Sequence, residues 1–267
     1  MSELVNVAIE NYVATVTLNR PDKHNALSVD MFEAIVEAGE QLGANKAVRA
    51  IVLCGKGPRF CAGLDFGEMQ SLVADIYIAA QTLGSLFKRD DDPDNLAQRV
   101  SYVWQKIDTP VIAALHGVVY GGGLQIALGA DIRITSGDAK FSIMEVRYGL
   151  VPDLGITQML PDLMPKDKAL ELTLSGRVFE PAEAKDLGIV TMIDESPLEK
   201  ATTLAQEIAG KSPSATRAIK KLYRESWRAD AAASLALEEK LQRELIGSKN
   251  QIEAVMASMQ KRAANYD

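Results

Sequence analysis

The stretch PVIAALHGVVYGGGLQIALGADIRI, residues 110–134, decides the fold class of this chain. It opens with the strand-like run Val111–Leu115, passes through the glycines Gly121–Gly123 and continues as an apolar segment that ends at Gly129. Residues 111–130 carry no formal charge, and a run of that length is long enough to cross a bilayer. Five glycines interrupt it, however, and a strand that turns into a helix would leave unpaired backbone groups in lipid. We therefore predict a buried strand, a glycine turn and a helix, and no membrane span.

Strands and helices alternate on both sides of this stretch. The runs Val5–Ile9 and Tyr12–Leu18, joined at ENY, predict a hairpin. Ser28 is a candidate N-cap for a helix that reaches about Gly43, and Ala50–Leu53 follows as a short apolar strand. The residues DIRIT after Ala130 predict another strand. Such alternation is typical of α/β layers.

The long segment between Gln70 and Thr109 is less regular. Its centre, KRDDDPDN at residues 88–95, is a charge cluster that predicts a solvated loop tip. The flanking segments 72–87 and 96–107 predict amphipathic helices, which leaves open that this region lies over a ligand.

Strand signals end near Glu199, and four helical segments follow to the C-terminus. We divide the chain into a core of residues 1–198 and a helical region of residues 199–267. A helical tail of this length packs either on its own core or on another subunit.

Composition excludes several classes of partner. With 267 residues, 47% apolar and 24% charged, the chain can bury a full core as one large domain, or as one with a small appendage. Its net charge of −7 argues against nucleic acid and against anionic membrane surfaces. The two cysteines, Cys54 and Cys61, are too few for a disulfide framework, and the N-terminal residues show no targeting pattern. We expect a cytoplasmic protein.

Two glycine-containing segments are candidate ligand sites. RFCAGLDF at residues 59–66 and HGVVYGGGLQIALGAD at 116–131 let backbone N–H groups approach a ligand without side-chain obstruction, which favours negative charge. Simple turns are the alternative. A dinucleotide fingerprint fits poorly because Ile126 stands where that motif needs glycine or alanine.

The segment MEVRYGLVPDLGITQ, residues 144–158, holds two acids in an otherwise apolar run. Asp153 follows Pro152, so it is either an N-cap, where a helix start would also lower its pKa, or half of a proton-transfer pair. Glu145 is either the other half or a buried, paired carboxylate.

Other candidates have simpler interpretations. His116 is expected to be a structural hydrogen-bonding residue under the glycine turn, and both cysteines are expected in the core. Trp104, Tyr77 and Phe87 are interpreted as packing residues rather than a cofactor site, with a hydrophobic ligand pocket as the alternative.

The segments NRPDKHNALS, GKGPRFCAGLD, PVIAALHGVVYGGGLQIALGADIRI, AKFSIMEVRYGLVPDLGITQ and ALELTLSGRVFEPAEAKDLGIV follow one another in the order of a known family. From Val5 to Arg262 the chain resembles the enoyl-CoA hydratase/isomerase (crotonase) superfamily. The resemblance implies a crotonase-type α/β spiral of ββα turns with a C-terminal helical region used for assembly as a homotrimer or a dimer of trimers. It implies an acyl-CoA thioester as substrate and neither a metal nor any cofactor beyond the coenzyme A of the substrate.

The resemblance also assigns residue roles. The backbone N–H groups of Leu64 and Gly122 correspond to the family's oxyanion hole, and two preorganised donors of this kind stabilise the enolate formed beside a thioester. Arg20 and Lys23 correspond to a loop along the nucleotide end of coenzyme A, with ordinary surface charge as the alternative. The remaining substrate contacts that it implies are Ala26, Ala62, Asp65 and Gly121.

The acids separate the members of the family. Hydratases carry acids at the positions of Gln125 and Glu145, and an amide at Gln125 does not accept and return a proton. Asp153 in VPDLG resembles the acid of the dienoyl-CoA isomerases, which also carry the acid matching Glu145 but have an aspartate where this chain has Gln125. The 4-chlorobenzoyl-CoA dehalogenases have a nucleophilic aspartate at the position of Asp153 but lack the acid matching Glu145. The favoured prediction is a double-bond isomerase; hydration of a 2-enoyl-CoA and a non-catalytic binding protein are the alternatives.

Overall fold

A six-stranded sheet forms the centre of the computed structural model, which describes residues 3–65, 67, 70, 74–89 and 91–266. Its strands lie in the order β1-β2-β3-β4-β6-β8, and their bounds are β1 Val5–Glu10, β2 Val13–Leu18, β3 Ala50–Gly55, β4 Val111–Leu115, β6 Ile132–Thr135 and β8 Met192–Ile193. The first pair is antiparallel, and the other neighbours are parallel. The predicted hairpin and the later strands are therefore confirmed.

A smaller parallel sheet pairs β5 (Val118–Tyr120) with β7 (Lys140–Ser142). Since β5 follows β4 and β7 follows β6, each of these turns of the chain adds one strand to the large sheet and one to the small sheet, as expected of a spiral of ββα turns. A bridge between Cys61 and Val119 joins the segment after β3 to this smaller sheet.

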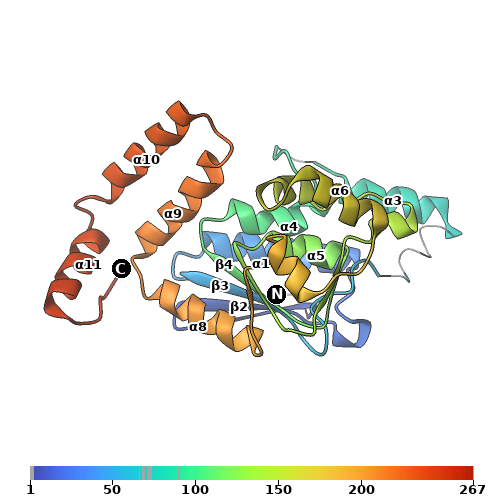
Figure 1. The fold of residues 1–267 in the computed structure, drawn as a ribbon, viewed down its shortest axis with the longest axis horizontal. Coiled ribbons are helices and arrows are strands. Elements are labelled where there is room, and N and C mark those ends of the chain that lie inside the picture. Colours follow the sequence, from blue (N-terminus) through green and yellow to red (C-terminus); the bar gives the residue numbers. More distant parts are fainter. Residues whose placement is uncertain (1–2, 66, 68–69, 71–73, 90, 267) are drawn as a thin grey trace.

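Helices cover both faces of the large sheet (Figure 1). On one face lie α1 (Val29–Ala44), α4 (Leu96–Lys106) and α5 (Gly122–Leu128), and on the other lies α8 (Pro197–Ala209). The strand β3 shows why its sequence is apolar throughout: Ile51 and Leu53 belong to the larger core, whereas Val52 packs in a second cluster with the buried alanines of α8. Ser28 caps α1 as predicted, its Oγ accepting a hydrogen bond from the N–H of Met31 at 3.2 Å.

Shorter elements and the remaining helices connect these layers. They are η1 Pro21–Lys23, α3 Ile76–Leu86, η2 Glu145–Tyr148, η3 Ile156–Gln158, η4 Leu160–Asp162, α6 Lys166–Ser175 and α7 Pro181–Asp186.

Three C-terminal helices form an arm that extends away from the core (Figure 1). They are α9 (Pro213–Ser226), α10 (Ala231–Leu245) and α11 (Lys249–Gln260). The sequence boundary between residues 198 and 199 falls inside α8, which packs on the sheet, so the arm begins later, at α9.

A buried lysine attaches the arm to the core. The Nζ of Lys220 on α9 lies 2.8 Å from Oδ2 of Asp131 and donates to the carbonyl oxygens of Trp104 and Thr109 at 2.7 and 3.0 Å. Burial lowers the pKa of Lys220, and the facing Asp131 opposes that shift. All three donor positions of this ammonium group are used, so its role is structural.

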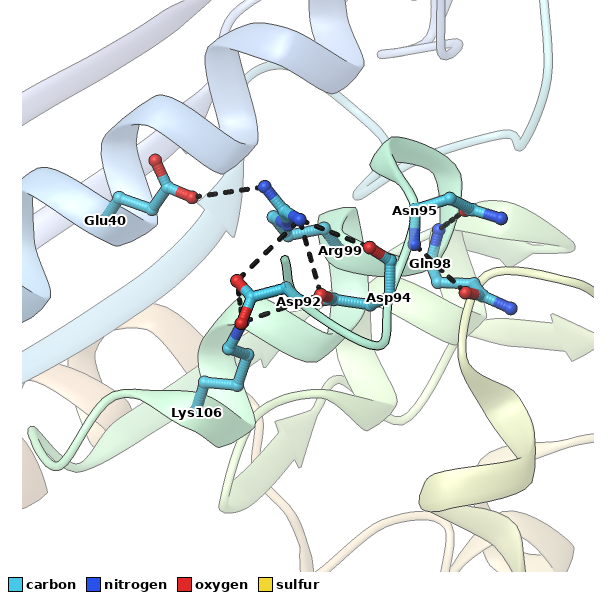
Figure 2. A network of polar contacts seen from close by, with 7 residues as sticks. All are labelled: Glu40, Asp92, Asp94, Asn95, Gln98, Arg99 and Lys106. Carbon is cyan, nitrogen blue, oxygen red and sulfur yellow. Dashed lines mark hydrogen bonds and ion pairs between the residues drawn. The ribbon is translucent and has the colours of Figure 1, made fainter. Parts of the chain in front are cut away.

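The charge cluster before α4 is only partly a solvated loop tip, and that prediction needs correction. Figure 2 shows Asp92 and Asp94 turned toward Arg99 and Lys106 of α4, and Glu40 of α1 turned toward Arg99. Asp94 is only 4% exposed and lies 3.4 Å from Arg99 and 3.5 Å from Lys106, whereas Asp92 lies 2.7 Å from Lys106 Nζ at the surface.

The next two residues of the same loop fix the start of α4. Asn95 accepts from the N–H of Gln98, and the Gln98 side chain accepts from the N–H of Asn95, which is a capping box (Figure 2). The cluster therefore anchors α4 rather than simply solvating a loop.

No helix in the part of the chain that the structure describes combines the length and the apolar character needed for a membrane crossing. The charge-free stretch of residues 111–130 is instead divided among β4, β5 and α5.

Candidate functional site

Three loops meet where the strands of the spiral end. The N–H of Leu27 donates to the carbonyl oxygen of Gly63 at 2.8 Å. The N–H of Cys61 donates to Val118 and that of Tyr120 donates back to Cys61, both at 3.1 Å. These bonds bring the two glycine-containing segments predicted from the sequence side by side.

The two predicted oxyanion donors border one region. A Cβ built on Gly63 would stand 3.8 Å from the backbone nitrogen of Gly122, so Gly63, and Leu64 after it, lie against the start of α5. Within the described residues, neither the N–H of Leu64 nor that of Gly122 has a hydrogen-bond partner. Both N–H groups are thus unpaired where the two glycine-containing segments meet in the described structure, which is what an oxyanion hole requires.

Position 122 requires glycine because there is no space for a Cβ. A Cβ there would stand 2.8 Å from Cδ1 of Leu27 and 2.9 Å from Cδ1 of Leu154. The same two leucines therefore form the apolar wall beside the free N–H, which strengthens electrostatic interactions by excluding water.

Glu145, the first residue of η2, is the buried acid of the site. It is 7% exposed, and its Oε1 accepts a hydrogen bond from Nε2 of Gln125 at 2.7 Å. Among the described residues its Oε2 has no hydrogen-bond partner. Burial raises the pKa of Glu145 above its ordinary 4.5, its own backbone N–H and the Gln125 amide oppose the rise, and the charge of Asp153 adds to it.

Gly121 brings the backbone of the glycine turn against this acid. Its φ is +51°, a conformation that favours glycine, and a Cβ there would stand 3.2 Å from Oε1 of Glu145. The predicted substrate contact at Gly121 therefore lies directly beside the predicted catalytic acid.

Asp153 is not an N-cap, and that alternative is wrong. The nearest helical turn, η3, begins at Ile156 with Gly155 as its cap residue and has no side-chain cap. The expected lowering of its pKa is also wrong. Asp153 is exposed, but the surrounding protein removes part of the water around its carboxylate. This partial burial raises its pKa above 3.8, and a hydrogen bond from its own backbone N–H opposes the rise.

Gln125 joins the loop of Asp153 to Glu145. Its Oε1 accepts a hydrogen bond from the N–H of Leu154 at 2.9 Å, while its Nε2 donates to Glu145. The sequence made Gln125 a candidate site residue that departs from the hydratase pattern, with an amide able to orient a water or the thioester, and the structure gives it two defined partners.

Gly155 holds this loop against α4, a feature that the sequence did not reveal. Its φ is +84°, and a Cβ there would stand 3.3 Å from the carbonyl oxygen of Gln98. Because Gln98 belongs to the capping box of α4, the anchor before that helix also supports the Asp153 loop.

The predicted contacts to the nucleotide end of the substrate divide into two kinds. Nη1 of Arg20 lies 2.7 Å from Oδ2 of Asp65 and donates to the carbonyl oxygen of Ala26 at 3.0 Å, so Arg20 ties two loops together. Lys23, at the end of η1, is exposed, and no ion pair of its ammonium group is found within the described residues. The N–H of Ala62 donates to the carbonyl oxygen of His24 at 3.1 Å.

The expectations for His116 and the cysteines agree with the structure. His116 Nε2 lies 2.9 Å from the carbonyl oxygen of Gly57, which is a structural hydrogen bond. Cys54 and Cys61 are buried, and burial raises the pKa of Cys61 to about 12.

The aromatic residues give a mixed result. Trp104 is fully buried, as expected of a packing residue. Tyr77 is 83% exposed and Phe87 is 48% exposed in the single chain. The interpretation of these two as packing residues of the core is therefore wrong.

The arrangement is suited to proton transfer beside an oxyanion. Two free N–H groups can stabilise a developing negative oxygen, and Glu145, whose Oε1 borders Gly121, has a second carboxylate oxygen, Oε2, without a partner among the described residues. Across the described ranges, no three His, Cys, Asp or Glu side chains gather as metal ligands.

Comparisons with known proteins agree over the whole chain. The sequence pattern of the family described as Enoyl-CoA hydratase/isomerase matches residues 8–267. A peroxisomal Delta(3,5)-Delta(2,4)-dienoyl-CoA isomerase of Arabidopsis thaliana is 34% identical over 99% of this chain and 96% of its own. The mitochondrial methylglutaconyl-CoA hydratase of Mus musculus is 30% identical over 95% of this chain and 79% of its own. A crystal structure of an enoyl-CoA hydratase from Bacillus anthracis has a TM-score of 0.88 at 27% identity and covers 98% of both chains.

Proposed function

Because this chain is an acyl-CoA-processing enzyme of the enoyl-CoA hydratase/isomerase family, we propose that its reaction is a shift of double bonds along an unsaturated acyl-CoA. Glu145 removes the proton from the carbon beside the thioester, and the electron pair of the broken C–H bond passes to the thioester oxygen, which gives an enolate conjugated with the double bonds of the chain. The N–H groups of Leu64 and Gly122 stabilise that dienolate oxygen. Asp153 returns a proton further along the chain, and the double bonds shift.

The observation that carries this proposal is the side-chain amide of Gln125, which is bonded to Glu145 and to the N–H of the residue after Asp153. Hydration in this family uses two carboxylates around one water, whereas here Gln125 donates to Glu145 and occupies the place of the second acid. Among the described residues, Asp153 is the acid whose charge acts on Glu145, and the Leu154 N–H next to it donates to Gln125.

Hydration of a 2-enoyl-CoA is the second candidate. It is supported by the retained Glu145 and by relatives named as hydratases, such as the mouse methylglutaconyl-CoA hydratase. In that reaction Glu145 would act with help from Asp153 or with a water held by Gln125.

Three substrates separate the candidates. The purified protein is incubated with a 3,5-dienoyl-CoA, a 3-enoyl-CoA and a 2-enoyl-CoA, and ultraviolet absorbance reports conjugation. We expect the absorbance of a conjugated 2,4-dienoyl-CoA to appear from the first. Loss of conjugation from the 2-enoyl-CoA alone would favour hydration, and no turnover of any thioester would favour a binding protein.

Coenzyme A itself is proposed to lie along the loop of η1. Lys23 has no ion pair within the described residues, whereas Arg20 is held by Asp65. No further cofactor is needed, because each step moves only protons and electron pairs within the substrate. Dialysis against a chelator should therefore leave the rate unchanged.

The arm is proposed to mediate assembly as a trimer or a dimer of trimers. The arm leaves large apolar side chains exposed in one chain, among them Ile219, Tyr223, Trp227, Leu235 and Ile246. Light scattering at micromolar concentration tests this, and a monomer would contradict it. The two buried free thiols suit a reducing compartment, so we also propose a cytoplasmic location.

A further inference from the structure

Gln125 uses both ends of its amide inside the protein. It is 1% exposed, accepts from the N–H of Leu154 at 2.9 Å and donates to Oε1 of Glu145 at 2.7 Å. The opposite orientation of the amide would set its NH₂ against an N–H and its oxygen against a carboxylate. The chemistry of the two partners therefore fixes which end is which.

This bond makes the two oxygens of Glu145 different. Oε1 is occupied by the Gln125 donor, whereas Oε2 has no partner within the described residues. A proton on Oε1 would face the N–H of the amide, but a proton on Oε2 leaves the Gln125 bond intact. The free oxygen is therefore the one suited to exchange a proton.

The other end of the same amide controls the second acid. Leu154 follows Asp153 directly, and Gly155 packs against Gln98 of α4. A displacement of the Gln125 amide would thus move Glu145 and the Asp153 loop relative to each other. Asp153 is also the charged group in the described part of the chain whose field acts on Glu145.

We propose that Gln125 is a positioning residue that holds Oε1 of Glu145, reserves Oε2 as the proton-carrying atom and fixes Glu145 relative to the Asp153 loop. The inference rests on the proposed function for its catalytic consequence alone. During turnover the substrate C–H bond breaks, an O–H bond forms at Oε2, and the electron pair passes to the thioester oxygen. Asp153, which enters the cycle protonated, gives its proton to the far end of the chain. Exchange with water then removes the proton from Oε2 and returns one to Asp153, so both acids regain their starting states.

The test combines kinetics with a measurement that needs no substrate. Gln125→Met keeps the length of the side chain and removes both hydrogen bonds. Gln41→Met is the control, because Gln41 donates to Glu37 at 2.8 Å in an equivalent pair on the exposed face of α1. The carboxyl of Glu145 is titrated by carbon NMR in the native protein and in each variant.

We expect Gln125→Met to raise the pKa of Glu145, because the ionised form loses its donor, and to leave it unchanged in Gln41→Met. The turnover number should fall by about 10²-fold, the loss that a misplacement of about 1 Å causes, while KM changes little. The acid limb of the pH–rate profile should move to higher pH by the same amount as the NMR titration.

Gln125→Glu guards against a variant that fails to fold. It preserves an acceptor for Leu154 but places a second carboxyl against Glu145, so the pKa of one member of the pair must rise strongly. An unchanged Glu145 titration in folded Gln125→Met, or two unshifted carboxyl titrations in folded Gln125→Glu, would overturn the inference, even if double-bond migration is observed. Conversely, a shifted titration in a protein that turns over no thioester would leave the positioning role standing and refute the proposed function.

Discussion

Gly155 and Gln98 approach so closely that a Cβ on the glycine would stand 3.3 Å from the glutamine's carbonyl oxygen. Gly155→Ala should therefore push the Asp153 loop away from α4 in addition to the cost of φ +84°, which is roughly 1–2 kcal/mol for a residue with a Cβ. We expect a lower free energy of unfolding and a lower turnover number. Gly247→Ala is the matched control, because its φ is +78° with nothing within 4 Å. Equal turnover in the two variants would contradict the supporting role of α4.

The two acids make a kinetic prediction. Glu145→Gln and Asp153→Asn should each lower the turnover number, since general acid–base groups contribute about 10²–10⁴-fold, and leave KM nearly unchanged. The double variant should lose far less than the product of the single losses. Steady-state kinetics on a 3,5-dienoyl-CoA provides the measurement. Full activity in Asp153→Asn would leave Glu145 as the sole acid that takes and returns the proton.

The raised pKa of Glu145 makes a prediction about stability. Between its ordinary value of 4.5 and the higher value in the fold, the folded chain binds more protons than the unfolded chain, so the free energy of unfolding falls as the pH rises through that window. Glu145→Gln removes the ionisation, and its Tm should exceed that of the native protein at neutral pH. The difference should disappear well below pH 4.5. Glu239→Gln, at an exposed site on α10, is the control, and an unchanged Tm in Glu145→Gln would refute the prediction.

The oxyanion hole is tested at Gly122 with two substitutions. Gly122→Pro removes the N–H and should abolish turnover on every substrate, since loss of one such donor costs about 3–4 kcal/mol of transition-state stabilisation. Gly122→Ala keeps the N–H but sets a Cβ 2.8 Å from Leu27, so it reports the effect of crowding alone. A folded proline variant with near-native turnover would show that the assignment is wrong.

The attachment of the arm is tested at Lys220. Lys220→Met leaves Asp131 without its cation and two carbonyl groups without their donor, and it should lower the free energy of unfolding by about 3 kcal/mol, the low end for a broken buried pair, because Asp131 keeps the Val111 N–H. Arg243→Ala, which breaks an exposed pair with Glu239, should cost at most about 1 kcal/mol. Denaturant unfolding compares them, and similar losses would contradict the anchor.

Local sequence patterns were enough for the elements that local forces determine. Ser28 caps α1 as predicted, and the apolar run of β3 is explained by burial on both faces. Features that depend on distant partners were not predictable. Asp94 is buried with Arg99 and Lys106 facing it, and nothing in the acidic run itself separates Asp94 from Asp92.

The site shows the same division. The glycine segments indicated free N–H groups, because a glycine turn before a helix has that geometry in any context. The partners of Gln125 were hidden, since the Leu154 N–H reaches it only through the packing of Gly155 on α4. Asp153 resembled a cap because Pro152 precedes it, and only the start of η3 at Ile156 excluded that interpretation.

The topology of the spiral also predicts an order of events during folding. The β1–β2 hairpin joins strands that are neighbours in the sequence. In contrast, β6 and β8 are separated by a long segment that includes α6 and α7, and this segment must close as a loop before they pair. Distant parallel pairings form slowly because the loops between them must close first. The carboxylate of Glu145 meets Gln125 only when the smaller sheet has closed at Gly121 and Ser142. Recovery of activity after dilution from denaturant should therefore lag behind the recovery of helix and strand signals, as the slowest phase of refolding.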